Sequence, residues 1–146
     1  MPDHQRPQET TPTIGGGVVS PRTFTLLVPD VLMLSANVRL HWRRKAAITR
    51  GIRFATKVQA LNQKIPRLER VHILGEYLPV DRRRRDPANW APSAKAAVDG
   101  LVDAGVLEDD DHTRVTGPDM RLGDLAQDVT GLRRPRLRLI ITEILL

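Results

Sequence analysis

The sequence predicts an α/β (α+β) domain, in which a small mixed β-sheet packs against two main helices. The 146 residues are enough for one compact core and too few for two ordinary ones. Segments with the two-residue periodicity of strands alternate with two segments of helical periodicity. The resulting order of strand, helix, strand, helix and further strands is typical of a sheet covered by helices.

The first structured element is expected after a flexible tail. Residues 1–21 are rich in Pro, Thr, Gln and Gly and have little apolar surface to bury. We therefore expect a single folded domain over residues 22–146. It begins with a strand at residues 23–28, where the residues are β-branched or apolar and Pro29 ends the run.

The strongest helical pattern lies over residues 40–63, after a turn at residues 35–37. This segment lacks proline, and Pro66 lies just beyond its end. The side chains at helical spacing, which we expect to face the core, are Ile48, Ile52, Ala55 and Val58. The other faces are strongly basic and carry Arg39, Arg43, Arg44, Lys45, Arg50, Arg53 and Lys57.

A second strand is predicted at residues 71–78, where side chains alternate up to Pro79. A shorter helix then runs from Pro92 to Ala104, with Gly105 as its expected C-cap. Its inward side chains are expected to be Ala94, Ala97, Val98, Leu101 and Val102.

The rest of the chain is expected to add strands to the same sheet. A short strand is predicted near residues 112–116, followed by an irregular polar stretch that contains Gly117 and Pro118. A last strand is predicted over residues 136–141, where Leu and Ile alternate with Arg.

The charge of the chain favours a phosphate-rich partner. There are 23 Lys and Arg against 17 Asp and Glu, and 19 of the 23 bases are arginine, which suits bidentate contact with phosphate. The charge is unevenly distributed: residues 1–85 carry +10, residues 86–128 carry −7 and residues 129–146 carry +3. A protein that only coats nucleic acid would have no such acidic segment inside a basic chain.

Several classes of protein are disfavoured by composition. No apolar run is long enough to span a bilayer and no secretory signal begins at Met1, so we expect a cytoplasmic protein with no membrane partner. The absence of cysteine excludes disulfides, thiolate zinc sites and cysteine nucleophiles. There is no glycine-rich phosphate loop, so no nucleotide cofactor is expected.

The stretch from Asp81 to Asp111 is the best candidate for chemistry. An arginine run ends in Asp86, a short helix places Lys95 and Asp99 on one face, and an acidic turn follows. Asp86 and Asp110 can approach only if that turn runs back toward the start of the helix. Clustered carboxylates repel one another unless a cation neutralises them, and Mg²⁺ typically uses one or two carboxylates with water and substrate phosphates.

Two interpretations of this stretch are open. Beside arginines that hold a phosphate backbone, such a site is typical of a metal-dependent phosphodiesterase, in which a lysine supports the charged phosphate. In the other interpretation, residues 108–111 are simply a solvated acidic turn. Trp90 is expected to pack against the domain or a partner subunit, although it could also insert into the phosphate-rich partner.

One segment resembles a known family. The pattern consists of Arg82–Asp86, Asn89, Lys95–Leu101, Asp103–Gly105 and Asp109–Asp110. It is similar to the signature region of RusA-type Holliday-junction resolvases, which are small dimeric endonucleases of phage and prophage origin. Ser35–Asn37 and Leu139–Glu143 also resemble parts of that family, so the similarity covers roughly residues 23–145.

The resemblance implies an endodeoxyribonuclease that cleaves four-way DNA junctions in recombination or repair. It implies a homodimer that uses Mg²⁺, with Mn²⁺ as a possible substitute, in the cytoplasm of a bacterial cell or phage-infected host. The implied catalytic residues are Asp86, Lys95 and Asp110, of which the two aspartates bind the metal. The expected DNA-binding residues are Arg39, Arg43, Arg44, Arg50, Arg82, Arg83, Arg84 and Arg85.

The chain departs from the family pattern at one carboxylate. Ala88 stands where the family has a second aspartate, and three extra residues, Trp90–Pro92, precede Lys95. Three explanations are open: a substitute ligand, a metal held by fewer protein groups and more waters, or a protein that binds junctions or acts as a regulator without cutting. The candidate substitutes are Asp99, Asp109 and Asp111. The simpler role for Asp99 is an ion pair that positions Lys95.

Overall fold

The computed structural model describes residues 13–14, 17–18, 20–29, 31–127 and 132–145. It contains a four-stranded mixed sheet and two main helices, so the predicted fold class is confirmed. The elements are β3 (Thr23–Leu27), α1 (Trp42–Asn62), β4 (Val71–Leu78), the 3-10 helix η1 (Pro87–Trp90), α2 (Ala91–Asp103), β5 (Val115–Leu122) and β6 (Arg136–Glu143). Most of the predicted tail lies outside the described residues. Within its described part, β1 (Thr13–Ile14) and β2 (Gly17–Val18) form a two-stranded antiparallel pair.

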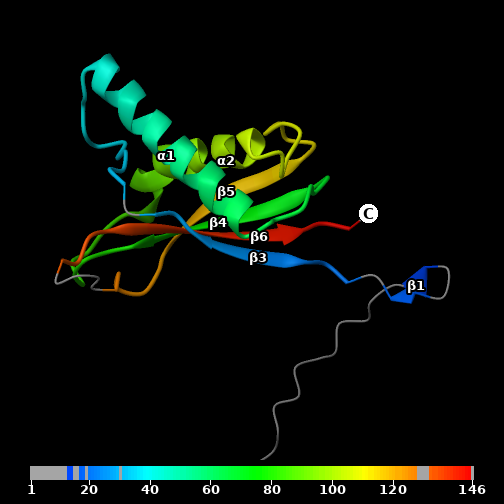
Figure 1. Ribbon diagram of the computed structural model, residues 1–146. Coiled ribbons are helices and arrows are strands. Elements are labelled where there is room, and N and C mark those ends of the chain that lie inside the picture. The colour runs from blue at the N-terminus through cyan, green and yellow to red at the C-terminus, as the bar shows by residue number, and fades with distance from the viewer. Residues whose placement is uncertain (1–12, 15–16, 19, 30, 128–131, 146) are drawn as a thin grey trace, which may run out of the picture.

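The strand order is β3-β6-β4-β5. The last strand of the chain, β6, lies inside the sheet and pairs antiparallel with both β3 and β4. In contrast, β4 and β5 are parallel, and η1 and α2 form the connection between them. Figure 1 shows α1 and α2 together on one face of this sheet.

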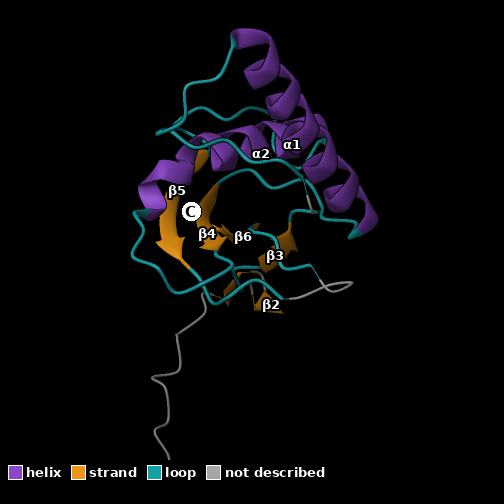
Figure 2. Cartoon of the chain, turned by 90° about the vertical axis from the view of Figure 1, so that its left-hand side faces the viewer, coloured by secondary structure: helices purple, strands orange, loops and turns teal. Residues whose placement is uncertain are grey.

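The core lies between the sheet and the two helices. Alternate side chains of the central strands, such as Ile73 and Leu139, are fully buried. From α2, the predicted inward residues Ala94, Ala97, Val98 and Leu101 are buried, while Val102 is half-buried. In Figures 1 and 2 the N-terminal end of α1 extends away from the sheet, and its first buried residue is Ile48.

The predicted inner face of α1 is partly wrong. Its buried side chains are Ile48, Ile52, Thr56 and Ala60, which form a row at four-residue spacing. Val58 is exposed on the flank of that row and Ala55 is only half-buried. Thr56 can be buried because its hydroxyl donates a hydrogen bond of 2.8 Å to the carbonyl of Ile52, which satisfies the polar group inside the helix.

The predicted strand at residues 112–116 is wrong in its start and its length. The strand β5 covers Val115–Leu122 and passes through Gly117 and Pro118, which were expected to be irregular. It is the edge strand of the sheet, where a proline without an N–H is tolerated. The register with β4 shifts beside this point, and Gly117 has a φ of +98°, a conformation that glycine adopts at little cost.

A membrane-spanning segment is not found in the described part of the chain. Neither helix there combines the length and the apolar character needed to cross a bilayer.

Candidate active site

The short helix η1 continues directly into α2 and carries Asp86 at its start. The carboxylate of Asp86 accepts a hydrogen bond of 3.0 Å from the backbone N–H of Ala88, so it serves as the N-cap. Trp90, at the end of η1, stacks on Tyr77 with a centroid separation of 4.1 Å and an angle of 9°. Packing of Trp90 against the domain is therefore confirmed, and burial raises the pKa of Tyr77.

The start of α2 is tied to the segment that leads into α1. The buried hydroxyl of Ser93 donates to the carbonyl of Leu34 at 2.8 Å and accepts from the N–H of the same residue at 2.7 Å. Nearby, the N–H of Ala36 donates to the carbonyl of Asn89 at 2.8 Å. These bonds connect residues distant in sequence and bring the approach to the basic helix next to the candidate site.

The chain turns back after α2, as the hypothesis of a metal site requires. Gly105 has a φ of +82° and lies just after the C-cap of the helix. Val106 and Leu107 are then buried, and the carbonyl of Val106 accepts from the N–H of Leu68 at 2.8 Å. This anchored return brings the acidic turn alongside the first half of α2.

Lys95, Asp99 and Asp110 form one cluster at the end of this return. The ammonium group of Lys95 donates a hydrogen bond to the carboxylate of Asp110 and lies 3.8 Å from Oδ1 of Asp99. The hydrogen bond raises the pKa of Lys95 and lowers the pKa of Asp110. Burial raises the pKa of Asp99, and the nearby Asp110 carboxylate raises it further, while the Lys95 ammonium group opposes the shift.

The other acidic residues of the turn have different partners. Oδ1 of Asp109 accepts the N–H of Asp110 at 2.7 Å, which stabilises the backbone of the turn. Asp111 accepts the N–H of Thr113 at 2.8 Å and pairs with Nη1 of Arg114 at 2.7 Å. Of the three candidate substitutes for the missing carboxylate, Asp99 is the one that pairs with Lys95, as Asp110 does.

The two aspartates assigned as metal ligands are not in direct contact. Asp86 makes neither a hydrogen bond nor an ion pair with Lys95, Asp99 or Asp110. Within the described ranges, no group of three or more His, Asp or Glu side chains is arranged to hold a metal ion. Asp99 and Asp110 both lie against the Lys95 ammonium group, and such a pair fits Mg²⁺ because that ion needs only one or two protein carboxylates when water and phosphate complete its shell.

The arginine run before Asp86 contains two kinds of side chain. Arg85 is only 18% exposed and donates to the Asp81 carboxylate at 2.6 Å and to the Asp81 carbonyl at 2.8 Å. Arg83 pairs with the same carboxylate at 3.3 Å. Arg82 and Arg84 are exposed and have no hydrogen bond or ion pair with any described residue. The role of Asp81 in holding this loop was not foreseen from the sequence.

The basic side chains on and just before α1 also differ in whether they form an ion pair. Arg39, Arg43, Arg44 and Arg50 are exposed and make no ion pair with the described acidic residues. The guanidinium of Arg43 lies 5.2 Å from the ring centre of Trp42, a side chain that is 68% exposed. Arg53 instead forms a two-point ion pair with Asp103 on α2, at 2.5 and 2.9 Å, and so connects the two helices.

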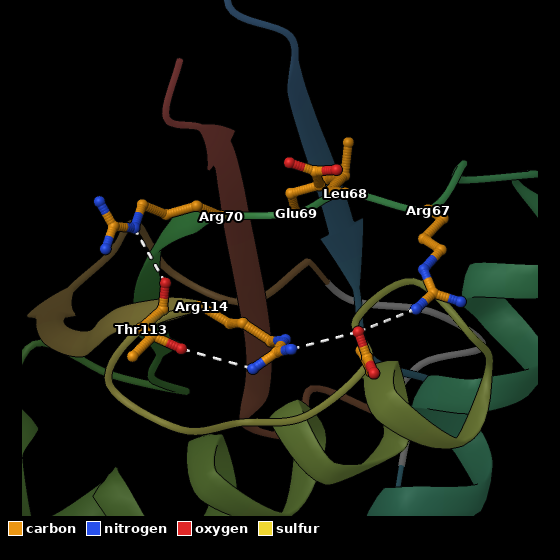
Figure 3. Close-up of a pocket in the computed structure, with 7 residues that line it drawn as sticks. Arg67, Leu68, Glu69, Arg70, Thr113 and Arg114 are labelled. Atoms are coloured by element: carbon orange, nitrogen blue, oxygen red, sulfur yellow. Dashed lines mark hydrogen bonds and ion pairs between the residues drawn. The ribbon is translucent and has the colours of Figure 1, made fainter. Parts of the chain in front are cut away.

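A second ionic cluster near the acidic turn was missed from the sequence. It lines a pocket of about 330 Å³ whose charged residues include Arg67, Arg70, Glu108 and Arg114 (Figure 3). The three-residue spacing of Asp111 and Arg114 was a sequence signal for one of its ion pairs, but Arg67 comes from a distant segment.

No protein-family model matches this sequence, and no curated protein gives a significant match to it.

Proposed function

We propose that this chain is a magnesium-dependent, structure-specific endodeoxyribonuclease that cleaves Holliday junctions or related branched DNA. The observation that supports it most directly is the cluster of Lys95, Asp99 and Asp110, in which a lysine meets two carboxylates. The resemblance of residues 82–110 to the RusA-type signature supplies the substrate class. Recombination or repair in the cytoplasm of a bacterial or phage-infected cell is the setting that this class implies.

The residues of the cluster have separate roles in this proposal. Asp110 and Asp99 would hold the metal, with Asp86 as a further ligand. A bound Mg²⁺ or Mn²⁺ supplies Lewis-acid polarisation of the phosphate and activation of water. Lys95 stabilises the negative charge that develops on the phosphate oxygens, because its ammonium group already lies against the carboxylates that define the site.

Asp99 is proposed as the substitute for the carboxylate missing at Ala88. It lies one helical turn beyond Lys95 and reaches Asp110, whereas Asp109 supports the backbone and Asp111 is paired with Arg114.

The DNA-binding surface is proposed to consist of exposed arginines that make no ion pair with the described acidic residues, namely Arg39, Arg43, Arg44, Arg50, Arg82 and Arg84. Those before η1 and those around the start of α1 flank the same end of α2, because Ser93 and Asn89 tie the two segments together. Their guanidinium groups would hold phosphates on either side of the cleavage point. A homodimer would present two such sites to the two-fold symmetric junction.

The test is cleavage of a synthetic four-way junction in the presence of Mg²⁺ or Mn²⁺. We expect the wild-type chain to nick the junction, and Asp110→Asn to abolish cleavage while junction binding persists. Asp109→Asn is the matched control, because an asparagine oxygen still accepts the N–H of Asp110. Cleavage that survives in Asp110→Asn would contradict the proposed site.

A non-catalytic junction-binding or regulatory protein is the second candidate. The lack of contact between Asp86 and the cluster, together with Ala88, favours it. Calorimetry with Mg²⁺ in the presence of junction DNA separates the two candidates. Metal binding that is lost in Asp99→Asn supports the nuclease, whereas junction binding with no metal affinity and no cleavage supports the second candidate.

A further inference from the structure

The acidic turn places several carboxylates close together, and basic side chains from other parts of the fold neutralise them. Glu108, Asp109, Asp110 and Asp111 are four consecutive carboxylates, and like charges at this spacing repel one another. Asp110 points to Lys95. Glu108 and Asp111, which lie on either side of the Asp109–Asp110 pair, instead both pair with Arg114.

The guanidinium of Arg114 bridges the two ends of the turn. Its Nη1 lies 2.7 Å from Oδ2 of Asp111, and its Nη2 lies 3.1 Å from Oε2 of Glu108. Arg67 adds a second contact of 3.1 Å to the same oxygen of Glu108. In Figure 3 the side chains of Arg114 and Arg67 point toward each other across the pocket, and dashed lines connect both to the carboxylate between them.

The two arginines are not equivalent. Arg114 is 31% exposed and contacts two carboxylates, whereas Arg67 is 65% exposed and contacts one. The ion pairs of Arg114 are therefore less screened by solvent. A planar guanidinium can engage two carboxylates at once, which the single ammonium group of a lysine does less well.

The backbone of Arg114 is held by the sheet. Its carbonyl accepts from the N–H of Val71 at 2.8 Å, where β4 begins, and its own N–H donates to the carbonyl of Asp111 at 3.0 Å. Because β4 lies inside the sheet, the guanidinium projects from a rigid base. The ends of the acidic turn are thus attached through one side chain to the core of the domain.

We propose that Arg114 is a positioning residue, which neutralises Glu108 and Asp111 and so holds the acidic turn in the conformation that brings Asp110 to Lys95. The consequence for catalysis rests on the proposed nuclease function. The positioning itself does not, since it concerns a contact within the free protein.

The contact can be followed by NMR of the lysine side chains. The chain has four lysines, so a Lys95→Arg variant assigns the ammonium signal of Lys95, whose hydrogen exchange is slowed by the bond to Asp110. We expect this signal to be lost in Arg114→Met and weakened in Arg114→Lys, while the other lysine signals stay unchanged. The matched control, Arg67→Met, should retain it. Far-UV circular dichroism verifies that each variant is folded.

An unchanged Lys95 signal in folded Arg114→Met overturns the proposal. Should that variant not fold, Arg114→Lys provides the same comparison, and a signal there equal to wild type overturns it as well.

Junction cleavage gives the second measurement. Loss of a residue that orients a ligand typically costs about 10-fold to 100-fold, so we expect kcat to fall by that factor in Arg114→Met with KM for DNA unchanged, and to be partly restored in Arg114→Lys. Equal cleavage by wild type and Arg114→Met overturns the positioning role. A wild-type chain that does not cleave, but whose Lys95 signal depends on Arg114, contradicts the nuclease proposal and supports the positioning role.

Discussion

At the scale of single residues, partners separate functional candidates from structural ones. Arg82 and Arg84 are exposed and have no partner among the described residues, while Arg85, in the same run, is half-buried against Asp81. Its hydrogen bonds, with that of the Arg83 N–H, also lower the pKa of Asp81. Identical side chains within four residues therefore have different roles, which the local environment decides.

This difference predicts opposite effects for neighbouring substitutions. Arg84→Ala should weaken DNA binding and reduce the slope of log affinity against log salt by about 1, because one phosphate contact is lost. Arg85→Ala should mainly lower the free energy of unfolding, because it leaves Asp81 without its closest partner. Fluorescence anisotropy over a salt series and urea denaturation measure the two quantities. Equal losses of affinity without any loss of stability would contradict this division.

At the scale of elements, the position of the site depends on how α1 and α2 pack. The helices approach so closely at Gly100 that a Cβ there would lie 2.5 Å from the carbonyl oxygen of Arg53 and 2.8 Å from Cβ of Thr56. Glycine allows the two backbones to meet at this point. The helix that carries Lys95 and Asp99 is thereby fixed against its neighbour.

A methyl group at the crossing should separate the helices. Gly100→Ala is expected to lower the free energy of unfolding by about 1–3 kcal/mol, as overpacking typically does. The control is Gly51→Ala on α1, where nothing lies within 4 Å of the added Cβ. There the higher helix propensity of alanine should stabilise the protein by up to about 1 kcal/mol. Urea denaturation of both variants gives the comparison, and a stable Gly100→Ala would show that the crossing can relax.

The ion pair between the helices predicts a pH dependence of stability. Arg53 lowers the pKa of Asp103, so the folded state favours the charged carboxylate. This contribution is present above the ordinary Asp pKa of about 3.9 and is lost as the pH falls through the lowered value. Asp103→Asn should therefore be less stable than wild type near pH 7, with the difference disappearing in acid. A difference that persists at low pH would assign the effect to packing instead.

At the scale of the whole molecule, the fold converts a linear charge pattern into a spatial one. The basic approach to α1, the arginine run and the acidic turn are far apart in sequence. Hydrogen bonds from Ser93 and Asn89, and the return of the chain after Gly105, bring all three to the first half of α2. In the proposed function, this arrangement places the candidate metal ligands of the acidic turn near the arginines proposed to contact phosphate.

Subunit number is the prediction that belongs to this scale. If a homodimer acts on a two-fold junction, analytical ultracentrifugation with an excess of protein should show two chains for each four-way junction, and loading should be unchanged in Asp110→Asn. One chain for each junction would contradict the dimer while leaving the site proposal intact.

Periodicity alone was sufficient for most of the fold. The order of the main elements follows from alternation, helical spacing and the positions of proline and glycine, because these are properties of neighbouring residues. The bounds of β4 agree with the prediction, whereas α2 begins and ends one residue earlier and β6 continues to Glu143. Helical spacing also predicted that Lys95 and Asp99 share one face, and Nζ of Lys95 lies 3.8 Å from Oδ1 of Asp99. The path of β5 could not be found in this way, because a strand that contains Pro118 is tolerated only at the edge of a sheet.

The sequence by itself thus determined the fold class, the acidic segment within a basic chain and the face shared by Lys95 and Asp99. Only the tertiary structure decided that Asp110 meets Lys95, that Thr56 rather than Val58 faces the core, and that Arg85 is held by Asp81. The physical reason is the distance along the sequence over which each kind of interaction acts. Helical spacing acts over three or four residues, whereas the contacts that bring the acidic turn to α2 depend on the buried return at Val106 and on the sheet that holds Arg114.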